Sequence, residues 1–298
     1  MKQYRQLLNR DIPGSITNDS CLVLEGGGLR GAFTSGVLEY FLENNIDFAR
    51  VVGVSAGACN GASYLSHQTG RNWKVNVEAP SDKRFMGFSH LFRNGSYFNM
   101  EFIFDEIPIS LVPFDEKALY QNPSEFDVII TSLSTGKSVA LAKSEIADIG
   151  LNKVLRATSS IPVISKPVDI NGQYYYDGGV SDSIPVKYAL EKHKKAVVVL
   201  TQPRGYRKVI SNSFLFYKLA FHKNPGFLHS MQTRNEEYNK TLDFCDKMEK
   251  EGRLYIIAPS PGFSVKRTEQ SLAKRARLYN HGYSHTGHTM EALLRFLT

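Results

Sequence analysis

The chain has 298 residues, enough for one large α/β domain or two smaller ones. Hydrophobic residues make up 42% and charged residues 22%, which predicts a packed globular core and excludes an intrinsically disordered chain. The net charge of +7 predicts attraction to a polyanion, and it does not choose between nucleic acid and an anionic membrane surface.

No apolar run approaches the roughly 20 residues that a membrane-spanning helix needs. The N-terminus has no apolar signal-peptide core, and we expect residues 1–19 to be a loosely packed lead-in. The three cysteines, Cys21, Cys59 and Cys245, form no C-x-x-C pair, so neither a metal knuckle nor a disulfide scaffold is expected. These features predict a cytoplasmic protein.

The first predicted element is a short buried strand over residues 21–25, which a glycine-rich turn follows. Gly26, Gly28 and Gly31 fit the pattern G-x-G-x-x-G, and a helical stretch over 32–44 comes next. In such a turn, backbone amides at a helix start face a negative charge. The pattern alone leaves two ligands open, a dinucleotide pyrophosphate or some other negative charge.

A second glycine-framed turn follows the predicted strand 48–55. Gly53, Ser55 and Gly57 form G-x-S-x-G, and a small-residue helix comes after them. This spacing is typical of a nucleophilic serine on a sharp turn between a strand and a helix, where small neighbours allow close approach. The order strand, helix, strand, helix also predicts a parallel sheet covered by helices.

The middle of the chain, residues 83–114, is dense in phenylalanine and shows no clean strand or helix period. Two interpretations remain open: core packing of an insertion, or an apolar lid or acyl-chain channel beside an active site.

The later predicted elements are strands over 126–136 and 136–144, a helix over 144–160, a hairpin at Asn171-Gly172, strands over 194–203 and 252–260, a charged helical segment over 204–250 and a helical tail over 263–298. The basic run Lys266 to Arg277 is predicted to be a solvated helix face. No zinc-finger spacing or RNA-binding aromatic pattern accompanies it, so no nucleic acid is expected as a partner.

A nucleophilic serine needs a base, and the histidines offer no clear one. His281, His285 and His288 have i, i+4, i+7 spacing, but no carboxylate or cysteine nearby completes a metal set, so a polar surface or capping role is favoured. Asp177 ends an aromatic hairpin arm and precedes two glycines. It is either a general base within reach of the serine or a carboxylate that caps the loop, and spacing leaves both open.

Three ordered motifs, Gly26 to Gly31, Gly53 to Gly57 and Asp177 to Gly179, together resemble the patatin-like phospholipase family over roughly residues 20 to 205. The resemblance implies a three-layer α/β/α sandwich with a mostly parallel central sheet, followed here by a helical C-terminal appendage. It implies Ser55 as nucleophile and Asp177 as general base, with no metal and no cofactor. The implied oxyanion hole and its turn are Gly26, Gly27, Gly28, Arg30 and Gly31, and the supporting motif glycines are Gly53, Gly57, Gly178 and Gly179. Arg30 is expected to support the turn.

We therefore expect a catalytic core over 20–205, including the insertion 83–114, and a region 206–298 with one further core strand and mostly helix. The expected function is hydrolysis of fatty-acyl esters of phospholipids or lysophospholipids, with transient contact with an anionic membrane at its inner face. One alternative is a non-catalytic lipid-binding protein on the same fold. Another is a dinucleotide-dependent oxidoreductase, which the second strand disfavours because Ser55 stands where an acidic ribose-binding residue is required.

Overall fold

The computed structural model describes residues 20–209 and 214–298, so the predicted lead-in over 1–19 lies outside the described residues. Eight strands form a sheet in the order β5-β6-β3-β2-β1-β7-β8, with β4 paired to β3. The strands are β1 (Ser20–Leu24), β2 (Arg50–Val54), β3 (Glu125–Ser132), β4 (Ser138–Ala142), β5 (Val168–Ile170), β6 (Gln173–Asp177), β7 (Lys195–Val199) and β8 (Leu254–Ile257).

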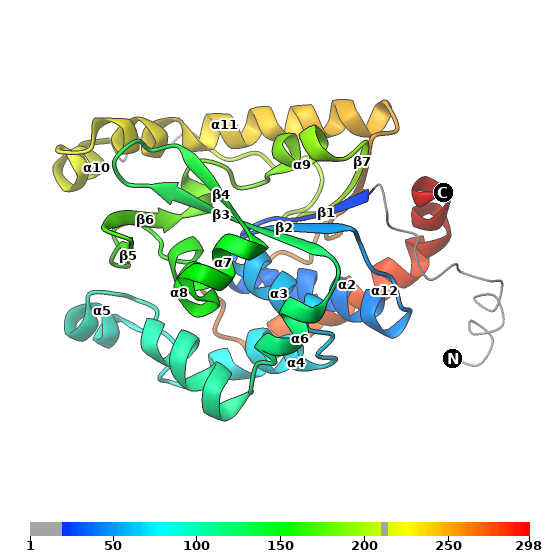
Figure 1. Ribbon diagram of the computed structural model, residues 1–298, viewed down its shortest axis with the longest axis horizontal. Helices are drawn as coiled ribbons and strands as arrows, with labels where there is room; N and C mark the ends of the chain where they lie inside the picture. The colour runs from blue at the N-terminus through cyan, green and yellow to red at the C-terminus, as the bar shows by residue number, and fades with distance from the viewer. Residues whose placement is uncertain (1–19, 210–213) are drawn as a thin grey trace.

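Helices connect the strands and cover both faces of the sheet (Figure 1). The α-helices are α2 (Ala32–Glu43), α3 (Ala56–Leu65), α4 (Arg71–Trp73), α5 (Phe88–Asn94), α6 (Glu116–Gln121), α7 (Lys143–Ile149), α8 (Leu151–Thr158), α9 (Val186–Lys192), α10 (Phe214–Phe221), α11 (Pro225–Lys250) and α12 (Leu272–Leu297). Short 3-10 turns span Gly28–Gly31, Ala79–Ser81 and Gly178–Val180, and π-helical segments span Lys74–Glu78 and Phe102–Leu111.

The centre of the sheet is parallel. Strand β2 pairs with β1 and β3, while β7 pairs with β1 and β8, all in parallel register. Strands β4, β5 and β6 add antiparallel pairs beside β3. The apolar residues of β1 are fully buried, as parallel strands covered on both faces require. The prediction of a mostly parallel sheet is confirmed.

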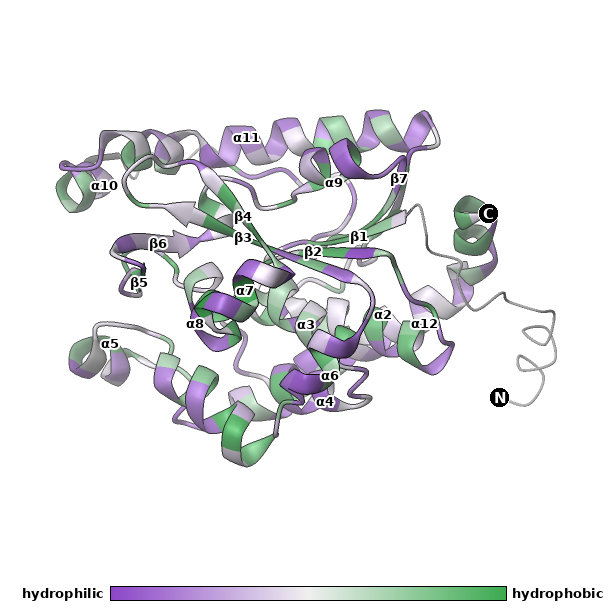
Figure 2. Cartoon of the chain, in the orientation of Figure 1, coloured by the Kyte–Doolittle hydropathy of each residue, from purple (hydrophilic) through white to green (hydrophobic). Residues whose placement is uncertain are grey.

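Two hydrophobic cores lie on opposite faces of this sheet. On one face, Val23 and Val52 pack with side chains of α9 and α11, including Ala189 and Leu242. On the other, Leu22 packs with side chains of α2, α3 and α12. Figure 1 shows these two helical layers, and Figure 2 shows apolar residues along the central strands and a largely hydrophilic α11. The three-layer α/β/α sandwich is therefore confirmed.

The C-terminal region differs from the prediction in one respect. The basic run Lys266 to Arg277 is not one solvated helix face, because α12 begins at Leu272, with the Ser271 hydroxyl accepting the Lys274 N–H. Arg275 is fully buried, and its guanidinium donates to the carbonyl oxygen of Val77. A charge pattern cannot reveal such carbonyl partners, which lie nearly 200 residues away in sequence.

Three smaller expectations can also be compared with the structure. The predicted helix over 144–160 consists of two helices, α7 and α8, which meet at Gly150 with a φ of +100°. The hairpin at Asn171-Gly172 joins β5 to β6 as predicted. The expected further strand is β8, while the domain boundary near residue 205 stays a prediction.

Among the described helices, none combines the length and apolar character that crossing a bilayer demands.

Candidate active site

Ser55 occupies the sharp turn between β2 and α3, as the G-x-S-x-G pattern predicts. Its backbone has φ 53° and ψ −126°, a conformation that costs a non-glycine residue about 1 to 3 kcal/mol. Gly57 allows the turn to form, since a Cβ there would lie 2.3 Å from the carbonyl oxygen of Leu24. Gly53 lies in β2 opposite Leu24 of β1. The strained turn places Ser55 just beyond the end of β2.

Thr158, which sequence reasoning missed, holds this turn in place. The Ser55 backbone N–H donates to Thr158 Oγ1 over 2.9 Å, and the Thr158 hydroxyl donates to the Ile129 carbonyl over 2.6 Å. Thr158 is fully buried at the end of α8. Its hydroxyl therefore ties the serine turn to β3, and no local pattern marks it for that role.

Asp177 ends β6 and lies beside Ser55. Burial raises the pKa of its carboxyl, while hydrogen bonds from the Gly179 N–H and with the Ser55 side chain lower it. The Gly179 N–H donates to Asp177 Oδ1 over 2.7 Å from the 3-10 turn Gly178–Val180. The structure thus places the two predicted residues at one pocket and shows that Asp177 caps its loop, while its role as general base stays a prediction.

The first glycine turn faces the same place. Gly26, Gly27 and Gly28 line a small pocket of about 400 Å³ together with Ser55 and Asp177. Gly28 has a φ of +56°, which turns the chain into the 3-10 segment that precedes α2. Within the described part of the chain, the N–H groups of Gly27 and Gly28 donate to no protein acceptor. They are therefore available to an incoming negative charge.

Arg30 and Gly31 stabilise the first glycine turn. Arg30 is 6% exposed, and its Nε donates to the Gly27 carbonyl over 3.3 Å. The Gly31 carbonyl accepts from Asn60 Nδ2 over 3.0 Å, which links the glycine turn to α3. Asn60 has no exposed surface, and a polar residue in a small-residue helix is the signal that could have identified it. Both contacts fix the turn, as a preformed anion site requires.

Glu25, at the end of β1, is a further buried residue that sequence reasoning missed. One carboxylate oxygen accepts from the Thr201 N–H and hydroxyl, and the other accepts from the Tyr238 hydroxyl over 2.7 Å. It therefore joins the start of the glycine turn to the loop after β7 and to α11. The partners arise only in the folded chain, so no spacing indicates them.

The three C-terminal histidines take no part in this site. His281 Nε2 accepts the backbone N–H of Ser260 over 2.9 Å, and its ring stacks on Phe263 at 3.8 Å between centroids. Among the described residues, no group of three histidine, cysteine or acidic side chains is arranged to hold a metal ion. The contacts of His281 are those of a packed, capping side chain.

An apolar pocket of about 970 Å³ adjoins the small one, and Ser55 and Gly28 line both. Part of its wall comes from the phenylalanine-rich insertion. The lining residues from that insertion are Phe85, Phe98, Met100, Ile103, Phe104, Ile107, Pro108 and Phe114. Several of these also belong to the main hydrophobic core. The insertion therefore packs into the core and also lines the apolar pocket, while its role as a lid or acyl-chain channel stays a prediction.

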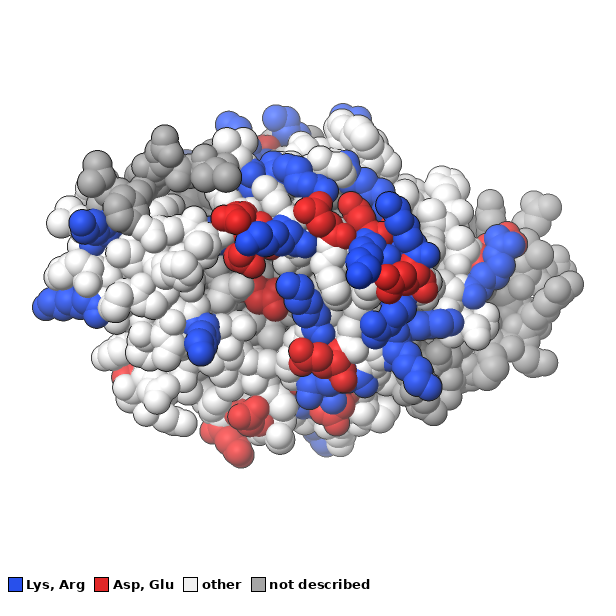
Figure 3. All heavy atoms as spheres, turned by 90° about the horizontal axis from the view of Figure 1, so that it is seen from above, with Lys and Arg blue, Asp and Glu red and all other residues white. Residues whose placement is uncertain are grey.

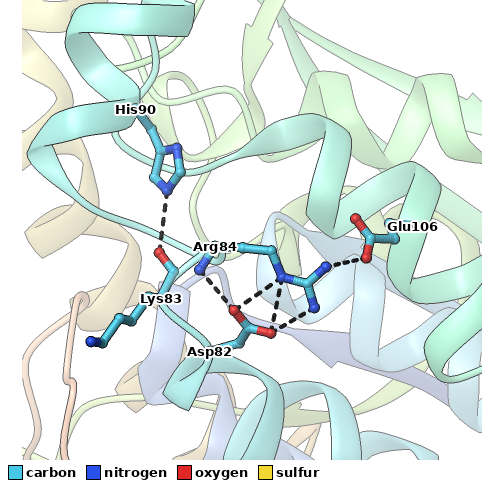
Figure 4. A network of polar contacts seen from close by, with 5 residues as sticks. All are labelled: Asp82, Lys83, Arg84, His90 and Glu106. Carbon is cyan, nitrogen blue, oxygen red and sulfur yellow. Dashed lines mark hydrogen bonds and ion pairs between the residues drawn. The ribbon is translucent and has the colours of Figure 1, made fainter.

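A polar network fixes this wall (Figure 4). Arg84 forms ion pairs with Asp82 and with Glu106 of the π-helical segment Phe102–Leu111. The Arg84 guanidinium also lies over the Phe102 ring, 4.4 Å from its centroid. His90 of α5 contacts the Lys83 carbonyl in the same network. These contacts join three parts of the insertion to one another.

Comparison with known proteins agrees with this geometry. A family model described as patatin-like phospholipase matches residues 22–190, and one described as a domain of unknown function (DUF6363) matches 224–298. The uncharacterized protein YjjU of Escherichia coli is 31% identical over 200 residues, which cover 63% of this chain and 52% of that protein. Lysophospholipase NTE1 of Cryptococcus neoformans is 25% identical over 213 residues, covering 66% of this chain and 12% of that protein.

The crystal structure of VipD from Legionella pneumophila shares the fold, with a TM-score of 0.52 at 13% identity over 92% of this chain and 67% of that one. The chain thus spans about half the length of the bacterial relative YjjU. The matched family model covers more than half of the residues and includes both glycine turns and Asp177. This chain belongs to the patatin-like phospholipase family.

Proposed function

We propose that the protein is a lipid acyl hydrolase in which Ser55 is the nucleophile and Asp177 the general base. The observation that carries the proposal is that Ser55, on its strained turn, and the buried Asp177 carboxylate line one small pocket together with the first glycine turn. This shared pocket supports Asp177 as the base for the Ser55 hydroxyl, because activation of a serine needs a base close to it. Membership of the patatin-like phospholipase family supports the same reaction class.

In the proposed reaction, Asp177 takes the hydroxyl proton while Ser55 Oγ attacks the ester carbonyl carbon. The carbonyl oxygen becomes an oxyanion, which the N–H groups of Gly27 and Gly28 stabilise. One such donor is worth about 2.7 to 4 kcal/mol in the transition state. The alcohol leaves with the proton that Asp177 returns, and an acyl-enzyme remains. Water, deprotonated by Asp177, then attacks the acyl carbonyl. The fatty acid leaves as Asp177 returns the proton to Ser55 Oγ, which restores the free enzyme.

The pocket supports a fatty-acyl ester as substrate. Its apolar wall begins at Ser55 and has room for an alkyl chain, which would be held by burial of its methylene groups. A relative named as a lysophospholipase supports phospholipid or lysophospholipid esters in particular. No step of this reaction needs a metal or an organic cofactor.

A non-catalytic lipid-binding protein is the second candidate, since the apolar pocket alone would suit it. The strained backbone of Ser55 favours the enzyme, because a binding protein gains nothing from a serine held at φ 53°. The dinucleotide alternative has no support at the end of β2, where Ser55 stands in place of an acidic ribose-binding residue.

Contact with an anionic membrane surface, and hence a peripheral location at the inner membrane face of the cytoplasm, is part of the proposal. Helix α5 exposes Phe88 and Phe92, the latter 87% exposed, and both belong to the insertion that forms the acyl pocket. Lys83 and Arg93 are exposed beside them. Exposed apolar side chains with cations near them favour binding to an anionic lipid surface. By contrast, Figure 3 shows basic and acidic side chains mixed over the α11 face, which does not favour a polyanion such as nucleic acid.

The proposed membrane contact can be measured by sedimentation with vesicles of phosphatidylglycerol and phosphatidylcholine. Replacing Phe88 and Phe92 by serine should weaken binding severalfold. Leu219→Ser, on an equally exposed apolar residue of α10, is the matched control and should bind like the wild type. Equal binding by all three proteins would contradict the assignment of this surface.

Hydrolysis is tested by fatty-acid release from lysophosphatidylcholine. The wild type should release fatty acid and Ser55→Ala should not. Ser183→Ala is the matched control, because Ser183 lines the same small pocket and its hydroxyl donates to the Gly179 carbonyl. If Ser55→Ala keeps the activity, Ser55 is not the nucleophile. If the wild type releases no fatty acid from phospholipid, lysophospholipid or short-chain esters, the hydrolase proposal is wrong.

A further inference from the structure

A third cavity opens to solvent beside the candidate active site and is rich in basic side chains. Arg30, Lys208, Arg234 and Arg267 all line it. They come from four separate elements: the first glycine turn, the loop after β7, helix α11 and the loop before α12. Three of the four lie in the C-terminal part of the chain, beyond the motifs that relate it to its family. Folding gathers them at one place.

These positive charges have little compensation. In the described structure, none of the four side chains forms an ion pair with a carboxylate. Arg234 Nε is buried without a hydrogen-bond partner among the described residues, and the Lys208 ammonium lies 3.6 Å from the centroid of the Tyr238 ring. Burial and the charges of Arg234 and Arg267 lower the pKa of Lys208 to about 7. Such mutual repulsion is costly unless an anion relieves it.

The nearest carboxylates do not neutralise this cluster. Glu25 acts on Arg30 and Lys208 through space, but its oxygens are occupied by Thr201 and Tyr238. Asp177 is buried, and its Oδ1 accepts the Gly179 N–H. Three arginines and the partly charged Lys208 therefore face two carboxylates that have other partners, and the cavity retains a positive excess.

The cluster is continuous with the site of the proposed reaction. Arg234 and Arg267 line the small pocket that holds Ser55 and Asp177 as well as the larger cavity. The Arg267 carbonyl accepts the Leu29 N–H over 3.0 Å, which fixes this loop against the first glycine turn. Ser55 also lines the apolar pocket, which Arg234 and Arg267 do not line. An ester bound at Ser55 would thus have its acyl chain on one side and cations on the other.

We propose that Arg234 and Arg267, assisted by Lys208 and Arg30, form a subsite for the phosphate group of the substrate's headgroup. This inference rests on the proposed function and makes it more specific, since it selects glycerophospholipids and lysophospholipids over neutral glycerides. Guanidinium groups suit a phosphate because their N–H donors match its oxygens. Free inorganic phosphate shares this chemistry, and the experiment must tell the two sources apart.

The first arm compares two substrates with the same acyl chain, lauroyl lysophosphatidylcholine and monolauroylglycerol. Arg234→Gln and Arg267→Gln should each lower the ratio of kcat/KM for the phospholipid to that for the glyceride by about ten-fold or more. The ratio cancels any effect of these charges on Asp177, which both substrates need. Arg295→Gln, an exposed arginine near the end of α12, is the control and should leave the ratio unchanged. An unchanged ratio in both test variants would overturn the proposal.

The second arm is independent of catalysis and uses calorimetric titration with octylphosphocholine, octyl glucoside and inorganic phosphate. Octylphosphocholine should bind the wild type at least ten-fold more tightly than either other ligand, and Arg267→Gln should remove that advantage. If inorganic phosphate binds as tightly and Arg267→Gln weakens both, the cavity is a free-phosphate site and the headgroup assignment is wrong. If the wild type hydrolyses neither ester but shows the expected titrations, the subsite stands and the proposed hydrolysis fails.

Discussion

The backbone N–H of Ser55 donates a hydrogen bond of 2.9 Å to the hydroxyl of Thr158, which lies 103 residues further along the chain. The same hydroxyl donates to the Ile129 carbonyl of β3. One fully buried side chain therefore satisfies both a donor and an acceptor at the strained turn. The position of the expected nucleophile depends on a residue outside every catalytic motif.

Thr158→Val tests this relationship. Valine has nearly the shape of threonine but leaves the Ser55 N–H and the Ile129 carbonyl without their partner, which costs about 1 to 3 kcal/mol for each buried group left unpaired. We expect a lower free energy of unfolding in urea and a reduced kcat. Thr158→Ser keeps the hydroxyl and should recover most of the kcat. If valine performs as well as threonine, this hydrogen bond does not position Ser55.

The backbone of Ser55 leads to a prediction about stability. Glycine adopts φ 53° and ψ −126° without the strain that serine bears, about 1 to 3 kcal/mol. Its more flexible unfolded chain offsets about 0.4 to 1 kcal/mol of that. Ser55→Gly should therefore unfold at a higher urea concentration than Ser55→Ala, although both lack the hydroxyl. Equal midpoints for the two inactive variants would show that the turn is unstrained.

Much of the fold was predictable from the sequence because the signals are local. The buried strands β1, β2 and β7 are short apolar runs, and the two glycine turns follow β1 and β2 directly. The fully buried Arg275 shows the limit of such reasoning, since the Val77 carbonyl to which it donates lies in another segment. A charge run predicts a solvated face unless the folded chain brings acceptors to it.

The candidate site was predictable only in part, for the same reason. Ser55 and Asp177 stand in recognisable motifs, whereas Thr158, Glu25 and Arg267 act through contacts made across the folded chain. The double role of residues 83–114 also needed the structure, because an irregular aromatic segment has no period that reveals which side faces a pocket.

Burial of Asp177 predicts a pH dependence. Burial raises the pKa of the Asp177 carboxyl above its ordinary value of 3.8. The protonated carboxyl therefore adds to the free energy of unfolding fully below pH 3.8, and this contribution is lost as the pH rises through the pKa of the folded state. The asparagine of Asp177→Asn is neutral at every pH, so the free energy of unfolding of this variant does not fall for this reason as the pH rises. Its gain in unfolding free energy over the wild type should therefore be larger at pH 8 than at pH 4.

The same substitution removes the proposed base, so hydrolysis should fall about 10²- to 10⁴-fold while the protein stays folded. In the wild type, kcat/KM should rise with pH as Asp177 loses its proton, with a midpoint above 3.8. A variant that hydrolyses ester at the wild-type rate would remove Asp177 from the role of base.

The apolar pocket predicts which acyl chains the enzyme accepts. Ile103 lines it, and Ile103→Phe would fill part of its volume. We expect kcat/KM for p-nitrophenyl laurate and palmitate to fall severalfold, with p-nitrophenyl butyrate little changed. Ile109→Phe is the matched control, since Ile109 lies in the same π-helical segment and is 69% exposed. A similar loss for all chain lengths would mean that this pocket does not hold the acyl chain.

The central claim is that Ser55, activated by Asp177, is the nucleophile. The most direct measurement is labelling with a fluorophosphonate probe, followed by peptide mass spectrometry of the modified residue. We predict a single adduct on Ser55 in the wild type and in Ser183→Ala, much slower labelling of Asp177→Asn, and no adduct in Ser55→Ala. An adduct on another serine, or a wild type that remains unlabelled, would contradict the account.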